Sequence, residues 1–290
     1  MLTFDPLLTA ALPVFIFFIL LEMWLVYARR DVPYPRKDAL ASVGMGIGSV
    51  PVTLGVKVVA FLVYSWLYKH RFHTFDMSSG WSWAALMLAD DFSFYWHHRT
   101  SHEVRLFWAG HVNHHSSEQY NFAVALRQSW GELTHKYFWW LWMPLVGFPP
   151  LAIFTGMAVS LIFQFFLHTE GVGRLGVLEY VLNTPSHHRV HHGANLRYLD
   201  RNYGGILSVW DRLFGSFERE GEKAVYGLTH NIHSNNLLVI AFHEYRALFA
   251  DVRRAPDLRS KLGYLFRPPG WRHDGPVETT RDLQSRLPQV

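Results

Sequence analysis

Histidine is concentrated in one part of the chain. Twelve of the eighteen histidines lie between residues 97 and 192, and ten of these twelve fall in three tight clusters. The clusters are His97, His98 and His102; His111, His114 and His115; and His187, His188, His191 and His192. Imidazole is the commonest metal ligand among side chains, and packing alone gives no reason for such a concentration. The chain is therefore predicted to fold around metal, and around more than one ion.

The composition indicates a membrane protein with large parts in water. Of the 290 residues, 50% are hydrophobic, 16% are aromatic and only 17% are charged, whereas soluble domains are about a quarter charged. The chain has no cysteine, which excludes disulfides, iron–sulfur clusters and thiolate zinc sites. The net charge of +4 comes without a basic stripe, so nucleic acid is not an expected partner.

Several apolar stretches are long enough to cross a bilayer. Residues 8–27 supply the twenty or so mostly apolar residues that a spanning helix needs. Residues 39–68 form a second stretch, and residues 81–96 form a third that runs directly into the first histidine cluster. Residues 137–168 are broken by prolines, which favours a hairpin that crosses out and back. We expect an all-α polytopic membrane bundle of about four spans, including this hairpin.

The cations after the first stretch predict the orientation of the bundle. Arg29, Arg30, Arg36 and Lys37 follow it directly, and by the positive-inside rule their loop is cytoplasmic and the N-terminus lies outside. The later spans then return the chain to the cytoplasmic side before each histidine cluster. We expect one membrane domain over residues 1–270, with its histidine core at 90–220, and a loose tail over residues 271–290.

Two aspartates, Asp90 and Asp91, interrupt the third apolar stretch. Carboxylates inside a membrane are costly and are functional candidates by default. The alternative places both aspartates at the cytoplasmic exit of the span, where they cost little. The sequence leaves these two placements open.

The spacing of the histidines is helical. His98 and His102 are four residues apart, and each of the other two clusters also contains an i, i+4 pair with a third imidazole between. Residues three and four apart share a helix face, so each cluster is expected to present two or three imidazoles to one point. His168 is a further candidate ligand. His187 points elsewhere on a helix, but it could also serve if the helix begins at Pro185.

The number of candidate ligands predicts two metal ions. The set is His98, His102, His111, His114, His115, His168, His187, His188, His191 and His192. A structural zinc takes four protein ligands and a catalytic zinc three. The eight clustered imidazoles at matched spacing, or nine with His168, are therefore more than one ion can bind. Imidazole suits zinc, copper, iron and nickel. Glu132 and His135 form one Glu-x-x-His match of the kind that soluble di-iron bundles use, and a single match is expected by chance.

Other polar residues are expected to support the ligands. Asp91 lies seven residues before His98, on the same helical face, and could accept a hydrogen bond from a ligand imidazole. Asn202 and Asp211 are further candidates for this role. The isolated histidines are interpreted as ordinary surface or packed groups: His70, His73, His230, His233, His243 and His273.

The motifs together resemble those of a known family. DFSFYWHHRTSH, FWAGHVNHHSSEQYN, FLHTE and NTPSHHRVHHGAN, followed by NYGGILSVWDRLFGSFERE, are similar to the fatty acid hydroxylase/sterol desaturase superfamily of membrane di-iron oxygenases. The last two segments look like its alkylglycerol monooxygenase branch and bacterial relatives. The resemblance covers roughly residues 10 to 270. It implies a cytoplasmic helical cap over a di-iron site at the membrane face, in a bacterial inner membrane.

The resemblance also implies ligands and an activity. The family's histidine motifs fall on the ten histidines of the candidate set, with His168 as the isolated ligand and His187 at a matching family position. The implied reaction hydroxylates or desaturates a lipid, such as a sterol, a fatty-acyl chain or an alkyl ether. It consumes O2 and takes electrons from an external donor, either a redox protein or a reduced pterin.

The histidine clusters also suit a different class of function. A histidine-rich membrane protein that binds or transports zinc or copper would line a path across the bilayer with its clusters. Here the clusters follow the spans on one side, which favours the enzyme. A zinc hydrolase would be expected to carry H-E-x-x-H, and the sequence has no such element.

Overall fold

The structure is a computed structural model that describes residues 6–27 and 34–287. Within these ranges it contains helices and two isolated bridges but no strand, which confirms the all-α prediction. The longer helices are α1 (Pro6–Glu22), α2 (Arg36–Lys69), α3 (Gly80–Glu103), α4 (Arg105–His115), α7 (Pro150–Phe165), α8 (Pro185–His191), α10 (Leu237–Arg254) and α11 (Leu258–Phe266). The shorter ones are η1 (Met23–Tyr27), η3 (Val124–Leu126), α5 (Leu133–Lys136), η4 (Tyr137–Trp140), α6 (Trp142–Val146), η5 (Gly176–Tyr180), α9 (Val209–Leu213) and α12 (Thr280–Gln284).

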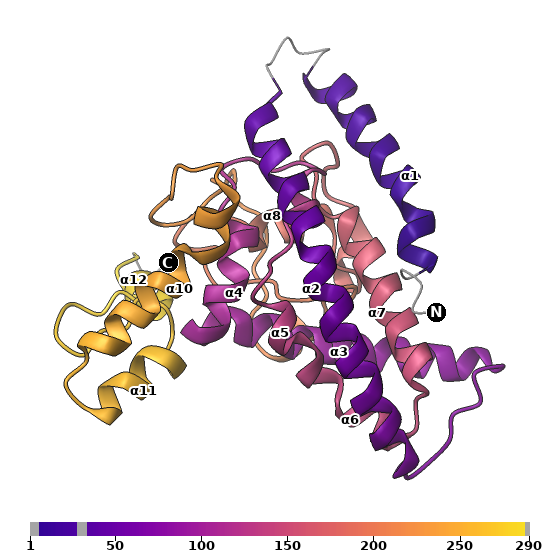
Figure 1. The fold of residues 1–290 in the computed structure, drawn as a ribbon. Coiled ribbons are helices and arrows are strands. Elements are labelled where there is room, and N and C mark those ends of the chain that lie inside the picture. Colours follow the sequence, from indigo (N-terminus) through magenta and orange to yellow (C-terminus); the bar gives the residue numbers. More distant parts are fainter. Residues whose placement is uncertain (1–5, 28–33, 288–290) are drawn as a thin grey trace.

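Two of these helices are long and apolar enough to cross a membrane. The first is α1 with part of η1, and the second is α2; their best windows have mean hydropathies of 2.2 and 1.9. Only 11% of each window is buried within the protein, so most of this apolar surface faces outward, as lipid contact requires. Both helices coincide with stretches predicted to span, and Figure 1 shows them running in opposite directions. Arg29 and Arg30, on which the predicted orientation partly depends, lie outside the described residues.

The third predicted span lies within α3, which runs without a break into His98 and His102. The side chains of Asp90 and Asp91 are both buried, so they face the interior of the protein rather than lipid or water. Asp90 accepts a hydrogen bond of 2.7 Å from the indole of Trp140. A buried carboxylate at membrane depth is expected to face the interior of a bundle, so the choice between the two placements stays a prediction.

The predicted hairpin has unequal limbs. Its first limb consists of the short helices η4 and α6, and the chain turns at Gly147, whose φ of +124° suits glycine. The second limb is α7, an apolar helix of 16 residues. The outgoing limb is thus too short for a regular spanning helix, because Pro144 and Gly147 interrupt it. A bundle of four spans stays a prediction.

An apolar core joins α2, α3 and α7. Its largest buried members include Tyr64, Leu86, Trp140 and Ile153. A second contact zone positions α4: Ala109 of α4 packs with Leu248, Ala255 and Tyr264 of the α10–α11 region. Figure 1 shows α10 and α11 beside α4, at the opposite edge of the molecule from α1. The first set of contacts positions α3, and the second positions α4.

The predicted tail contains one short helix. α12 lies within residues 271–287 and begins with a capping box formed by Thr279 and Asp282. Gln284 donates hydrogen bonds of 3.1 and 2.9 Å to the carbonyls of Leu196 and Leu199. The capping box stabilises a short helix that the surrounding Pro, Gly and charged residues had obscured.

Candidate metal centre

Three helix segments bring the histidines together. α3 ends and α4 begins at Val104, whose extended backbone (φ −121°, ψ 117°) turns the chain sharply. As a result the last turn of α3 packs against α4. α8 begins with Pro185 in its first turn, as predicted, since proline suits a position whose N–H has no helical partner. These segments converge on the middle of the molecule.

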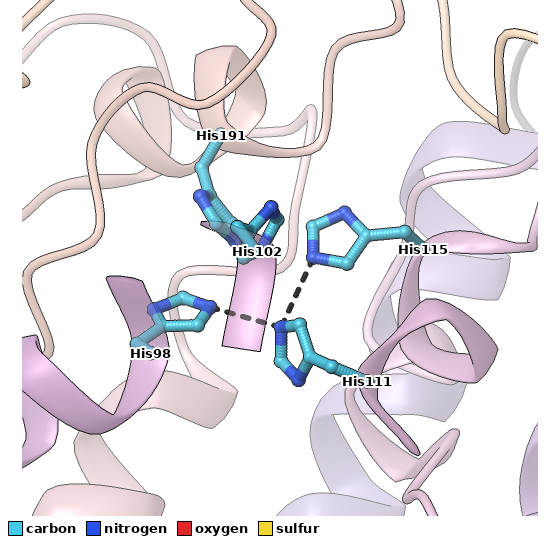
Figure 2. Close-up of side chains that lie close together, drawn as sticks. All are labelled: His98, His102, His111, His115 and His191. Atoms are coloured by element: carbon cyan, nitrogen blue, oxygen red, sulfur yellow. Dashed lines mark hydrogen bonds between the residues drawn. The ribbon is translucent and has the colours of Figure 1, made fainter. Parts of the chain in front are cut away.

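The histidines form two groups. The five-histidine group is His98, His102, His111, His115 and His191; the four-histidine group is His114, His168, His188 and His192. Within each group the potential ligand nitrogens lie within 4.8 Å of one another. Figure 2 shows the five imidazoles turned toward a common point. The structure thus brings together nine of the ten candidate ligands.

His187 is the candidate that lies outside both groups. Its ring meets the ring of Phe217 edge-on at 5.1 Å. Successive residues on a helix point about 100° apart, so His187 cannot face the same point as His188. Each of the six isolated histidines also lies outside both groups.

The division of the clusters differs from the expectation of one point per cluster. His111 and His115 of α4 enter the five-histidine group, whereas His114 enters the other. In the third cluster, His188 and His192 share a group and His191 is separate. Residues four apart diverge by about 40°, while adjacent residues diverge by about 100°. The intermediate histidines of the second and third clusters, His114 and His191, therefore face the neighbouring site.

The two groups are contiguous. The rings of His115 and His192, one from each group, stack with centroids 4.4 Å apart. The rings of His111 and His114 are 5.9 Å apart. Ions held in the two groups would be neighbours, as a dinuclear centre requires.

Hydrogen bonds at Nδ1 fix the tautomers of several imidazoles. His98, His168 and His191 each place Nδ1 at 2.8–2.9 Å from a backbone carbonyl, those of Tyr203, Gln164 and Arg201 respectively. A carbonyl only accepts, so each Nδ1 carries the proton. Burial lowers the pKa of His168 to about 4 and that of His191 to about 3. These rings are therefore neutral at pH 7, and their Nε2 lone pairs are free.

The Nε2 atoms of these and neighbouring imidazoles face one another. Nε2 of His111 lies 3.1 Å from Nε2 of His98 and 3.3 Å from Nε2 of His115 (dashed in Figure 2). Nε2 of His168 lies 3.1 Å from that of His188 and 3.2 Å from that of His114.

A cation explains this arrangement. His98 and His111 both hold their protons at Nδ1, so their facing Nε2 atoms would repel without a positive charge between them. Two nitrogens about 2.0–2.1 Å from one ion, at an angle between about 90° and about 109°, lie about 2.8–3.4 Å apart. The observed separations fall in this range. In addition, the buried Nε2 atoms of His102, His191 and His192 have no hydrogen-bond partner in the described structure. The residues present therefore fit two bound metal ions.

Glu132 supports the five-histidine group. One carboxylate oxygen lies 2.9 Å from Nδ1 of His111, and the other lies 2.7 Å from Nε2 of His97. Burial would raise the pKa of Glu132, but His111 and His97 hold that pKa well below its usual value, so the carboxylate is ionised. A carboxylate on the far nitrogen of a ligand imidazole fixes its orientation and makes it a stronger donor. His135, the partner that the sequence spacing suggested for Glu132, belongs to neither group.

The three residues expected to support the ligands act on the chain around residues 202–218. Asp91 accepts hydrogen bonds from the backbone N–H groups of Ile206 and Leu207 and from the indole of Trp210. Its expected contact with a ligand imidazole is not among the interactions of the described structure. The carboxylate is already occupied, because this loop lies against α3.

Asp211 and Asn202 hold the backbone that orients two imidazoles. Asp211 accepts from the N–H groups of Tyr203 and Gly204 at 2.7 and 2.8 Å, and the carbonyl of Tyr203 orients His98. Asn202 has a φ of +56° and bonds with its side chain to the backbone of His187 and Glu218. Both residues thus act through the backbone rather than by touching a ligand ring.

A surface pocket adjoins the four-histidine group. Tyr120 is buried with its ring 5.8 Å from that of His168 and 5.3 Å from that of His192. Its other side stacks on Tyr226 at 4.7 Å. Both tyrosines line an open pocket of about 420 Å³, together with Glu118 and Glu170. The four-histidine group therefore lies one aromatic ring away from the protein surface.

Residues 83–216 match the family model of the fatty acid hydroxylases. This stretch contains α3, α4 and α8 and all nine grouped histidines. The chain thus carries a fatty acid hydroxylase domain, and the family resemblance inferred from its motifs is confirmed.

Comparison with individual relatives shows which members of the fatty acid hydroxylase family the chain is similar to. The chain is 39% identical to human alkylglycerol monooxygenase over 283 residues, which cover 97% of this chain and 62% of the relative. It is 40% identical to the alkylglycerol monooxygenase of Danio rerio over 266 residues, covering 90% and 59%. An ornithine lipid hydroxylase of Rhizobium tropici is 30% identical over 137 residues, covering 44% and 39%. The chain spans about three fifths of the length of the alkylglycerol monooxygenases it matches. No solved structure matches the chain.

Proposed function

We propose that this chain is a membrane-bound non-haem di-iron oxygenase that hydroxylates or desaturates a lipid. It would use O2 and electrons from an external donor. The observation that carries the proposal is the convergence of nine imidazoles on two contiguous points, several with free Nε2 lone pairs facing one another. The fatty acid hydroxylase domain supports the same assignment.

Iron is the metal that fits both the nine imidazole ligands and the fatty acid hydroxylase family. Nine nitrogens divide into five and four, which suits two ions of four- to six-fold coordination with positions left open. Two iron ions, when bound, would supply the activation of O2 and the attack on an unactivated C–H bond. The chain's own residues hold the ions through Nε2, orient the rings through Nδ1, and bury the centre away from bulk water.

The substrate is proposed to be a membrane lipid. α1 and α2 would keep the centre at the bilayer, where an acyl, alkyl or sterol chain is available. Among these lipids we place an alkyl ether first, because relatives similar over most of this chain are alkylglycerol monooxygenases. Fatty-acyl and sterol substrates come next, and desaturation is the alternative outcome to hydroxylation.

The setting of the enzyme follows the predicted orientation. Residues 1–270 form one membrane domain in the bacterial inner membrane, with α3 and α7 adding spans to α1 and α2. The centre faces the cytoplasm, because Ser117, two residues after His115, donates a hydrogen bond to Asp38 in the first turn of α2, where Arg36 and Lys37 continue the basic loop. The external donor is a redox protein or a reduced pterin, and the pocket beside Tyr120 offers it the nearest approach.

Metal analysis with lipid turnover tests the proposal. Purified wild-type protein should hold about two iron ions per chain and form an oxygenated lipid product only when O2 is present. His115→Ala and His191→Ala should both abolish turnover while expression is retained. His243→Ala, which changes an isolated histidine outside both groups, is the matched control.

Two results would contradict the proposal. One is wild-type turnover and iron content in either ligand variant. The other is stoichiometric zinc or copper together with metal movement across proteoliposomes and no O2 consumption, which would favour the transport alternative.

A further inference from the structure

The outward faces of α10 and α11 are apolar. On α10, Leu238 and Phe249 are 63% and 57% exposed; on α11, Leu258 and Phe266 are 71% and 56% exposed. At about 100° per residue, Leu238, Phe242 and Phe249 share an arc of about 40°, and Leu258, Leu262 and Phe266 share one of about 80°. These are continuous stripes rather than scattered exposed residues, and such stripes mark interaction surfaces.

The inner faces of the same helices are already occupied. Leu248 and Tyr264 are buried against Ala109 of α4, and Ile240 and Ala241 are buried against the first turns of α2. The two helices are therefore fixed to the domain through one side, and the apolar stripes form the opposite side. Within the described structure, Phe242 meets the ring of Trp130 edge-on at 6.1 Å, while Leu238, Phe249, Leu258 and Phe266 remain more than half exposed.

The charges on this pair are sorted by sign. Arg246 and Arg253 are exposed and lie within about 40° of the apolar stripe of α10. The acidic residues Glu244 and Asp251 turn inward, where both pair with Arg105 at 2.8 Å. Around the turn and on α11, Arg254, Arg259 and Arg267 are exposed, against one exposed acid, Asp257.

The position of α10 relative to α2 indicates what covers the apolar stripes. Leu237, the first residue of α10, would contact a Cβ placed on Gly44 of α2, and Ile240 packs near Ala41 and Met45. These residues lie in the first turns of a candidate membrane span. If α2 crosses the bilayer, α10 begins at the level where the bilayer surface lies.

We propose that α10 and α11 dock on an anionic bilayer surface as an amphipathic pair. Their apolar stripes enter the acyl boundary, and the arginines reach the lipid headgroups. A basic face beside an apolar stripe is the pattern of helices that lie in the membrane interface, and anionic lipids attract clustered arginines at that depth. The proposal depends on the membrane placement of the proposed function but not on its chemistry.

Site-directed labelling tests this docking directly. Because the chain has no cysteine, single variants Phe249→Cys and Leu262→Cys can each carry one environment-sensitive fluorophore. The full chain is placed in nanodiscs of phosphatidylcholine and phosphatidylglycerol that contain nitroxide-labelled acyl chains. Leu62→Cys, at an exposed position of α2, is the positive control, and Glu222→Cys, in an exposed polar loop, is the negative control.

The expected result is quenching at Phe249→Cys and Leu262→Cys well above that at Glu222→Cys. Adding Arg246→Glu and Arg253→Glu, or omitting phosphatidylglycerol, should weaken the quenching of both labels while Leu62→Cys is unaffected. Quenching equal to that of Glu222→Cys overturns the docking, and quenching that ignores lipid charge overturns the role of the arginines. Cross-linking between Phe249→Cys copies without lipid quenching would assign the surface to a second copy of the chain instead.

The readout separates this proposal from the proposed function. The labels report membrane contact in protein of any metal content, so loss of turnover does not affect them. Conversely, a protein that holds iron and turns over lipid, but whose label on α11 is not quenched, would support the proposed function and contradict the docking.

Discussion

The five-histidine group and the four-histidine group use the same side chain but hold it differently. In the five-histidine group, Nδ1 of His98, His111 and His191 each faces a hydrogen-bond acceptor, and Nδ1 of His102 lies 3.4 Å from Asp200. In the four-histidine group, His168 bonds to the carbonyl of Gln164. The buried Nδ1 of His188 has no partner in the described structure.

This difference implies a division of roles. Partners on the outer nitrogen fix ring orientation and raise ligand strength, so the five-histidine group is the more rigid. The four-histidine group has one imidazole fewer, and Tyr120 separates it from a surface pocket. It therefore leaves more coordination positions open and lies closer to incoming molecules. We expect the first group to anchor metal and the second to exchange with the surroundings.

The largest effect should come from removing one member of the stacked pair that joins the groups. His115→Ala and His192→Ala should both reduce lipid turnover below detection, because both ions are required. His192→Ala should also lose more iron, since it leaves three imidazoles where His115→Ala leaves four. Iron per chain after gel filtration measures this. Equal iron loss in the two variants would remove the distinction between anchor and exchange sites.

Acid should destabilise the metal-free protein through both groups. Burial lowers the pKa of His168 to about 4 and that of His191 to about 3, below about 6.5 in an unfolded chain. The unfolded state then binds protons first as the pH falls, so stability that is fully present above about pH 6.5 is lost as the pH falls to about 4 for His168 and to about 3 for His191. For His168 alone the loss approaches roughly 3 kcal/mol. Thermal unfolding of chelator-treated protein in detergent should show a lower midpoint at pH 5 than at pH 7.5, and an unchanged midpoint would contradict the burial of neutral rings.

Glu132→Gln should weaken only the five-histidine group. The amide keeps one acceptor but loses the charge and the second acceptor, so His111 and His97 can no longer both donate to it. Metal affinity should fall by about 10- to 100-fold, seen as one of the two ions becoming removable at lower chelator concentration. Glu118→Gln changes an exposed carboxylate paired with His233 and should leave both ions in place. Loss of both ions from Glu132→Gln would mean that the groups do not differ in their support.

Tyr120→Phe should have the smallest effect. It removes the hydroxyl that donates to the carbonyl of Leu167 at 3.0 Å and keeps the ring against His168. Stability should fall by about 1 kcal/mol, with iron content unchanged, as measured by thermal unfolding and metal analysis. Loss of iron would show that the four-histidine group depends on hydrogen bonding as much as the five-histidine group does.

Much of the ligand set could be predicted because helix geometry is local. The i, i+4 spacing of His98 and His102, and of His111 and His115, places each pair on one face whatever the rest of the chain does. The partition of His114 and His191 between the groups could not be predicted in the same way. It depends on how α3, α4 and α8 are turned relative to one another, and that is set by packing between distant segments.

The residues that orient the ligands carry even less sequence signal. Three of them, Tyr203, Arg201 and Gln164, act through backbone carbonyls, which every residue possesses. The local sequence pattern pairs Glu132 only with His135, three residues later. The imidazoles that Glu132 contacts, those of His111 and His97, lie 21 and 35 residues before it. Long-range pairing of this kind is a product of the fold rather than of any local pattern.

α8 is a helix of only seven residues that contributes ligands to both histidine groups, and this affects how the two groups take up metal ions. This helix supplies His188 to one group and His191 to the other, and His192 follows at its end. α8 is buried along its whole length, so an ion bound in one group further restrains this helix and with it an imidazole of the other group. Part of the conformational entropy that α8 loses on metal binding is therefore lost with the first ion and not again with the second. The first ion to bind should accordingly raise the affinity of the other group for the second ion, even though the two groups differ in their own affinity.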